Sequence, residues 1–235
     1  MKRGLGLVVA LGALWLPETG WAFVRTHVSP SDANSPCLFW GSKKVPFRLS
    51  TRGSSRKGTD AFPAIRNALK AWTDATCSDF EFDDLGTSDS LAAGFNKALL
   101  NQPFLAGDVS PVNVIMFRSK TCSEVVPAGD DCTDSANDDC ASKYDCWEFG
   151  SSVIGLTTTT YSFQTGQIFE ADMELNEASF IFTTQDPPAP TCSPPPAPQV
   201  ACVGIDLQNT VTHEAGHMLG LGHSADTSAT MFASA

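Results

Sequence analysis

The stretch His213-Glu214-Ala215-Gly216-His217-Met218-Leu219-Gly220-Leu221-Gly222-His223 decides how the C-terminal part of the chain folds. Residues four apart lie on one face of a helix, so His213 and His217 project side by side. A helix continued to His223 would carry that residue to nearly the opposite side. Gly220 allows a turn before it, because glycine adopts the left-handed conformation that ends a helix. His223 can then reach the other two histidines.

Three imidazoles that meet at one point are typical ligands of a catalytic zinc ion, which keeps its fourth position for water. Zinc lowers the pKa of that water, and a nearby carboxylate takes the proton as the water attacks a polarised carbonyl. Glu214 is placed for that role. The alternative is a helix with surface histidines, but three of the four histidines in the chain fall in this register. The pattern therefore predicts one catalytic Zn²⁺ site.

The pattern His-Glu-x-x-His-x-x-Gly-x-x-His, followed by a methionine, resembles the metzincin clan of zinc endopeptidases. Ser224 after the third histidine, and the eight-residue step from His223 to the methionine, are most similar to the matrixin branch. Without the motif, the methionine is equally consistent with an ordinary core residue. The resemblance implies three zinc ligands, a general base and a turn methionine beneath the metal, which are His213, His217, His223, Glu214 and Met231.

The first 22 residues have the three parts of a secretory signal peptide. Lys2 and Arg3 supply the charged start, residues 5–16 form an apolar run, and Gly20-Trp21-Ala22 offers small residues for cleavage. A membrane anchor is the alternative, but the run is shorter than the ~20 residues that span a bilayer. We expect cleavage after Ala22, a secreted (extracellular) protein, and no membrane span in the mature chain.

Composition indicates one domain. With 235 residues and 42% hydrophobic content, the chain has the size of a single well-cored unit. We expect residues 23–235 to form one metzincin-like catalytic domain. After removal of residues 1–22, 13 basic and 25 acidic residues remain, a net charge of about −12. Such a charge disfavours nucleic acid and anionic membranes as partners. No sequence feature indicates an oligomer.

Eight cysteines, an even number in an exported chain, predict disulfides. Thiolate zinc ligands are the alternative, and no paired Cys-x-x-Cys spacing supports them. Cys192 and Cys202 flank the proline-rich stretch 193–200, and we predict that they pair. Cys37 is interpreted as another disulfide cysteine, because it lacks the residues that surround the propeptide cysteine of matrixins.

The segment from Cys122 to Cys146 contains four cysteines and six aspartates but few apolar residues. We expect disulfides to hold it in place of a core. Its aspartates are interpreted as a solvated acidic loop, with Ca²⁺ binding as the alternative. His27 is the one histidine outside the motif, so the second, structural zinc of matrixins is expected to be absent. We hypothesise that the disulfide-rich loop replaces it.

The fold class predicted is α/β (α+β). Residues 44–50, 80–82, 112–117, 153–163 and 168–176 have strand patterns. Apolar residues from Phe62 to Trp72 recur at helical spacing, with Thr59 or Asp60 as the cap, and Asp206 can cap the helix of the zinc motif. The resemblance implies a twisted, mixed, five-stranded sheet with one backing helix and one zinc-binding active-site helix.

The resemblance also implies that residues 153–163 form the edge strand beside the active-site cleft, where an extended peptide can add to the sheet. In residues 170–176 acidic and apolar residues alternate, and these carboxylates are expected to be solvated or to bind calcium. The sequence ends four residues past Met231, before the segment that forms the specificity pocket in metzincins. We therefore expect a domain truncated at its C-terminal end.

Together these features predict a secreted zinc-dependent metalloendopeptidase that hydrolyses peptide bonds in proteins, with Glu214 as general base. The alternative is a secreted zinc-containing binding module of the same fold without proteolytic activity. An intact Glu214 argues against that alternative, because loss of the base is the simplest sign of lost chemistry.

Overall fold

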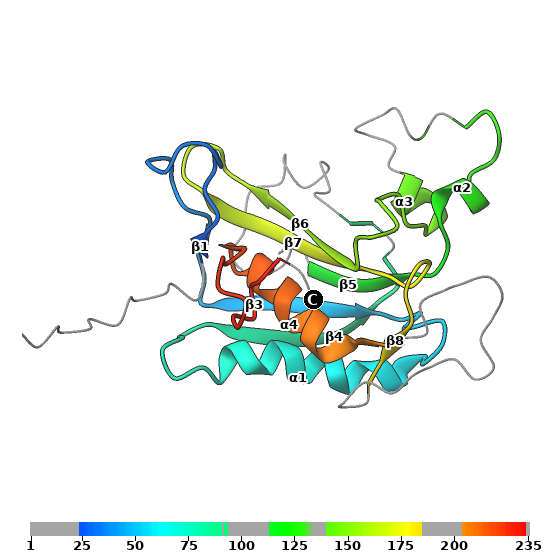
Figure 1. Cartoon of the computed structure of the whole chain (residues 1–235), viewed down its shortest axis with the longest axis horizontal. Helices are drawn as coiled ribbons and strands as arrows, with labels where there is room; N and C mark the ends of the chain where they lie inside the picture. The colour runs from blue at the N-terminus through cyan, green and yellow to red at the C-terminus, as the bar shows by residue number, and fades with distance from the viewer. Residues whose placement is uncertain are drawn as a thin grey trace, which may run out of the picture.

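One mixed β-sheet organises the computed structural model, which describes residues 24–90, 92–93, 113–130, 132, 140–184 and 204–233 (Figure 1). Four long strands are parallel, and the antiparallel β6 pairs only with β7 among the described strands. The order of the long strands is β4 (Glu81–Ser88), β3 (Lys44–Ser50), β5 (Asn113–Arg118), β7 (Gln167–Asn176) and β6 (Gly155–Tyr161). The mixed α/β class is confirmed.

The described sheet has six strands, so the predicted number of five is wrong by one. The additional strand is β2 (Phe39–Trp40), which pairs in parallel with the first residues of β7. Two residues are too few to produce an alternating pattern in the sequence. Short strands also form two separate pairs. These are β1 (Val24–Arg25) with β10 (Leu221–Gly222), and β8 (Phe182–Thr183) with β9 (Ile205–Asp206).

Helix α1 (Phe62–Thr73) and helix α4 (Leu207–Met218) pack against each other and against one face of the sheet (Figure 1). The core includes Ile65 and Leu69 of α1, Val211 and Met218 of α4, and Leu175 of β7. The predicted caps of α1 are wrong. Thr59–Ala61 forms a short 3₁₀ helix, and the N-cap of α1 has no side-chain hydrogen bond.

The acidic residues of β7 are buried on the face of the sheet opposite the core, which corrects the expectation of solvated carboxylates. Glu170, Asp172 and Glu174 are only 6%, 1% and 3% exposed. Asp172 Oδ1 accepts a hydrogen bond from the backbone N–H of Val114 at 2.7 Å. One oxygen of Glu170, Oε2, has no hydrogen-bond partner. Burial, and secondly the charge of Asp172, raise the pKa of Glu170 to about 8.

Two disulfides hold the segment between β5 and β6, as expected for a segment without a core. Cys122 pairs with Cys146 and Cys132 with Cys140, which brings together α2 (Cys122–Val125) and α3 (Cys140–Tyr144). The two described aspartates of the segment contact cationic side chains: Asp130 contacts Lys143, and Asp145 contacts Arg52 and Arg118. Asp131, Asp134, Asp138 and Asp139 lie outside the described residues, so the calcium hypothesis stays open for them.

Cys37 is a free thiol, so its interpretation as a disulfide cysteine is wrong. The antiparallel bridge between His27 and Cys37 turns the thiol toward the imidazole, and Cys37 Sγ lies 3.7 Å from His27 Nε2. The predicted pair Cys192–Cys202 and the signal segment 1–22 lie outside the described residues. Among the described helices, none is long and apolar enough to cross a membrane.

Candidate metal centre

Helix α4 is positioned by contacts at both ends. Asp206 caps its start as predicted, because its side chain accepts a hydrogen bond from the backbone N–H of Asn209 at 3.0 Å. Trp72 Nε1 donates to the carbonyl of Thr212 at 2.8 Å, and Trp40 Nε1 donates to the carbonyl of Met218 at 2.7 Å. The second bond satisfies a carbonyl that has no partner within the helix. The helix is thereby tied to α1 through Trp72 and to strand β2 of the sheet through Trp40.

Gly220 ends the helical turn in the left-handed conformation that the sequence predicts, with φ of 82°. A Cβ atom at this position would lie 2.9 Å from the carbonyl oxygen of Leu38 and 3.1 Å from its Cβ. Both the backbone conformation and the close approach therefore require glycine. The chain then turns back through β10 and brings His223 to the histidines of α4.

The three histidine side chains meet at their Nε2 atoms. His223 Nε2 lies 3.2 Å from His217 Nε2 and 3.2 Å from His213 Nε2. Nitrogen ligands about 2.0–2.1 Å from a tetrahedral zinc ion are about 3.3–3.4 Å apart, so the observed spacing fits such an ion. In the described part of the chain these residues form the one group of three or more His, Cys, Asp or Glu side chains that could hold a metal.

The hydrogen bonds of the Nδ1 atoms determine that the Nε2 atoms of His213 and His217 point toward each other and toward His223. His213 Nδ1 lies 2.8 Å from the carbonyl oxygen of Thr230, and His217 Nδ1 lies 2.8 Å from that of Leu221. A carbonyl only accepts hydrogen bonds, so both Nδ1 atoms carry protons and, in the neutral rings, both Nε2 atoms present lone pairs. Converging lone pairs repel each other unless a cation lies between them. The donor set therefore fits a zinc ion on chemistry as well as on distance.

The electrostatics of the site favour neutral imidazoles, the form that binds a metal. Burial lowers the pKa of His217, and a smaller contribution comes from the charge of His213. Burial also lowers the pKa of His223, together with the charges of His217 and His213. A positive charge on one ring disfavours a second positive charge on a neighbouring ring, because the Nε2 atoms lie 3.2 Å apart.

Glu214 points into the same site, but its carboxylate is held by residues of the sheet. It is 6% exposed, and the hydroxyl of Thr157 on β6 lies 2.8 Å from Oε2. Gly155 of β6 faces the other oxygen, Oε1, which would lie 3.2 Å from a Cβ atom at that position. Burial raises the pKa of Glu214, and the Thr157 hydrogen bond and the charges of His213 and His223 partly oppose this. The carboxylate is therefore oriented by the strand, not by its own helix.

Met231 lies beneath α4, where it belongs to a small buried cluster with Val45, Leu219 and Leu221. A Cβ atom at Gly216 would overlap Met231 Sδ and lie 3.0 Å from Trp72 Cζ2. The side chain of Met231 therefore fills the space that the missing side chain of Gly216 leaves. All five predicted site residues are brought together by the structure.

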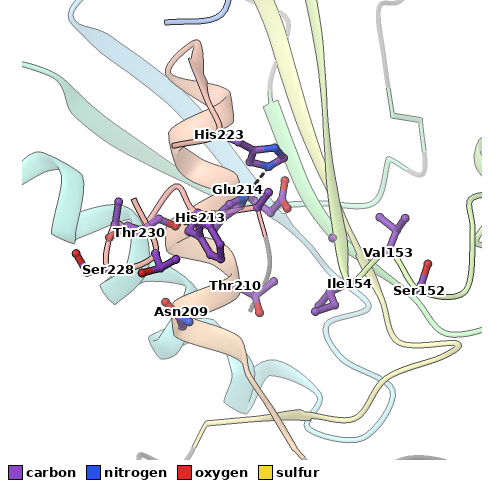
Figure 2. Close-up of a pocket in the computed structure, with 15 residues that line it drawn as sticks. Ser152, Val153, Ile154, Asn209, Thr210, His213, Glu214, His223, Ser228 and Thr230 are labelled. Carbon is purple, nitrogen blue, oxygen red and sulfur yellow. Dashed lines mark hydrogen bonds between the residues drawn. The ribbon is translucent and has the colours of Figure 1, made fainter. Parts of the chain in front are cut away.

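A cavity of about 760 Å³ adjoins His213, His223 and Glu214. Figure 2 shows His213 and Glu214 on α4 beside His223, with Ser152, Val153 and Ile154 on the other side of the cavity. The remaining lining includes Asn209 and Thr210 from the first turns of α4 and Ser228, Thr230 and Phe232 from the turn that carries Met231. A second cavity of about 340 Å³ lies along β6 and is also lined by Glu214, His217 and His223.

The region that contains this site is similar to known proteins. The family model Matrixin matches residues 144–235, which include β6, β7, α4 and the turn with Met231. This is a matrixin-like protein. Metalloendoproteinase 1-MMP of Arabidopsis thaliana is 56% identical to it over 32 residues, which are 14% of this chain and 9% of the plant protein. The matched segment thus spans less than a tenth of that relative.

Sequence reasoning did not find two residues of this matrixin-like site. Thr157 and Gly155 contact Glu214 although they lie 57 and 59 positions before it. The string of threonines from Thr157 to Thr160 indicates a half-exposed strand, but it does not distinguish the one hydroxyl that contacts a carboxylate. Only the pairing of β6 with β7, and the packing of α4 beside β6, select Thr157.

Proposed function

We propose that the protein is a zinc-dependent metalloendopeptidase. The observation that carries the proposal is the convergence of three Nε2 atoms, 3.2 Å apart in two pairs, with the carboxylate of Glu214 beside them. His213, His217 and His223 would hold the metal. When bound, zinc supplies a Lewis acid that polarises the scissile carbonyl and makes water acidic enough to be deprotonated near neutral pH.

The protein's own residues supply the base and its orientation. Glu214 accepts the proton of the attacking water and later delivers it to the leaving amine. Thr157 donates a hydrogen bond to Oε2 and so leaves Oε1 as the atom that exchanges the proton. Because α4 and the carbonyls of Thr230 and Leu221 hold the imidazole rings, the reaction requires little rearrangement of the site.

We infer that peptides bind along β6. Among the described strands β6 pairs with β7 alone, and its first residue, Gly155, borders both cavities beside Glu214. An extended peptide that adds to the free edge receives backbone hydrogen bonds and directs alternate side chains into the two cavities. The substrate class is therefore an unfolded or extended polypeptide segment.

We also propose that the protein is exported and that its signal peptide is cleaved after Ala22. The support is the pattern of residues 1–22 and the two disulfides, Cys122–Cys146 and Cys132–Cys140, which are typical of proteins that fold outside the reducing cytosol.

The test compares hydrolysis of casein by the secreted chain and by Glu214→Gln, with Glu81→Gln as the matched control. Glu81 is an exposed residue of β4 that pairs with Lys44, remote from the histidines in the fold. We expect Glu214→Gln to lose at least about a thousandfold in kcat while it still binds zinc, and Glu81→Gln to keep full activity. Removal of zinc with a chelator should abolish hydrolysis, and added zinc should restore it.

Equal hydrolysis by the unaltered chain and by Glu214→Gln would refute the mechanism. An unaltered chain that binds one zinc ion and casein but hydrolyses nothing would instead favour a binding module.

A further inference from the structure

The N-terminal hairpin, residues 24–40, lies against the turn that carries the third histidine (Figure 1). Its first strand, β1, pairs antiparallel with β10, so that Val24 faces Gly222 and Arg25 faces Leu221. The backbone N–H of Thr26 extends this ladder by donating to the carbonyl of Gly220 at 2.9 Å. The hairpin therefore forms a continuous backbone contact over residues 220–222, directly before His223.

The second arm of the hairpin supports the first. The backbone N–H of Leu38 donates to the carbonyl of Thr26 at 2.8 Å, and the Arg25 guanidinium donates to the carbonyl of Leu38. Leu38 is 1% exposed and lies in contact with Gly220. The two arms are thus joined at the place where they contact the turn.

The same turn holds two of the three histidines. The carbonyl of Leu221 accepts the hydrogen bond from His217 Nδ1 at 2.8 Å, and His223 is the second residue after Leu221. Any displacement of β10 would therefore rotate the ring of His217 and move His223. A ligand's backbone partner sets both the tautomer and the direction of its lone pair.

We propose that the N-terminal hairpin is a positioning element of the metal centre, with Arg25 and the backbone N–H of Thr26 as its contacts. It acts on the ligands through β10 and is not itself a ligand. This inference rests on the proposed function, because it assumes that the three histidines bind zinc. Its consequence is that the affinity for zinc depends on a segment about 190 residues before the motif in the sequence.

Substitutions at Thr26 separate the backbone contact from the side chain. Thr26→Pro removes the N–H that bonds to Gly220, whereas Thr26→Ala keeps it. A second pair tests the side-chain contact. Arg25→Ala removes the guanidinium from Leu38, and Arg48→Ala removes a comparable arginine–carbonyl contact, to Leu85, between β3 and β4. Arg25→Lys keeps a donor at the first position.

Zinc affinity is measured on the folded, disulfide-intact chain by competition with a chromophoric chelator, and circular dichroism records the fold. We expect Thr26→Pro to weaken zinc binding about 10–100-fold, the range typical for loss of an outer hydrogen bond to a ligand. Arg25→Ala should weaken it about threefold to tenfold, with recovery in Arg25→Lys. Thr26→Ala and Arg48→Ala should bind zinc as the unaltered chain does. Absorption of the cobalt-substituted protein should change in the weakened variants only.

A folded Thr26→Pro protein with unchanged zinc affinity and cobalt spectrum would overturn the inference. If Thr26→Pro does not fold, the comparison of Arg25→Ala with Arg48→Ala decides, and equal affinities overturn it. An unaltered chain that binds no zinc would refute the proposed function. Equal zinc affinities of the unaltered chain and of the folded hairpin variants would overturn the present inference alone.

Discussion

Replacement of Gly216 by alanine tests the packing beneath the histidines. Position 216 lies inside α4, where alanine is favoured over glycine by about 1 kcal/mol. The structure opposes this gain, because the new Cβ would overlap Met231 Sδ and lie 2.9 Å from Met231 Cε and 3.0 Å from Trp72 Cζ2. The side chain of Met231 can move, but it is 1% exposed and has little free space around it.

The magnitude follows from the balance of these two effects. Overpacking of a filled core costs about 1–3 kcal/mol, so after the helix gain we expect Gly216→Ala to destabilise the protein by roughly 1 kcal/mol. Met231→Ala alone removes a buried side chain and should cost about 2–4 kcal/mol. In the Met231→Ala background the overlap with Met231 is gone and only the 3.0 Å approach to Trp72 Cζ2 remains, so Gly216→Ala should then stabilise by less than about 1 kcal/mol. The prediction is a reversal of sign.

The assay is urea unfolding of the four proteins of this double-mutant cycle, with disulfides intact and the same zinc concentration throughout. A coupling free energy of about 2 kcal/mol between the two positions is expected. If Gly216→Ala had the same effect with and without the Met231 side chain, the two residues would be independent and the packing argument would be wrong. Zinc affinity measured in parallel reports whether the displacement of Met231 reaches the histidines.

Three further substitutions test the burial of charge and the orientation of Glu214. In the folded protein the pKa of Glu170 is about 8, compared with an ordinary value of 4.5. Between these two pH values the folded state holds a proton that the unfolded state has lost, so folding stability should fall as the pH rises. Glu170→Gln should therefore be more stable than the unaltered chain at pH 8.5, by on the order of 2 kcal/mol after allowance for solvent screening, and similar to it at pH 5, in thermal unfolding. Thr157→Val removes the hydrogen bond to Glu214 and should lower kcat about tenfold in casein hydrolysis while zinc affinity stays unchanged. Arg118→Met leaves the buried carboxylate of Glu174 without its guanidinium partner and should cost about 3 kcal/mol in denaturant unfolding, an effect that should shrink at low pH where carboxylates are protonated.

The parts of the molecule that could be predicted from sequence depend on local geometry. The cap by Asp206, the helix through His213 and His217, and the left-handed Gly220 each follow from the preferences of a few consecutive residues. The strand patterns at 44–50 and 168–176 also agree with β3 and β7, because period-two alternation is a property of one strand.

The remaining features depend on which distant segments meet. Burial of Glu170 and Asp172 reverses the expected exposure of an alternating strand, since both faces of β7 are covered. The pairing of Cys122 with Cys146 and of Cys132 with Cys140 follows from the fold of the segment and not from cysteine spacing. Cys37 faces His27 because two arms of a hairpin pair there, a contact that no local pattern indicates.

The metal centre itself combines both kinds of information. The motif places two imidazoles on one face of α4 and brings the third to them through the turn that follows. The direction of the Nε2 lone pairs of His213 and His217 depends, however, on the hydrogen-bond partners of their Nδ1 atoms. Those partners are backbone carbonyls of Thr230 and Leu221, in two segments with different supports. The first segment is held by Met231 beneath Gly216, and the second by the N-terminal hairpin. A sequence can therefore contain every ligand of the motif and still lose the site, if either supporting contact is absent.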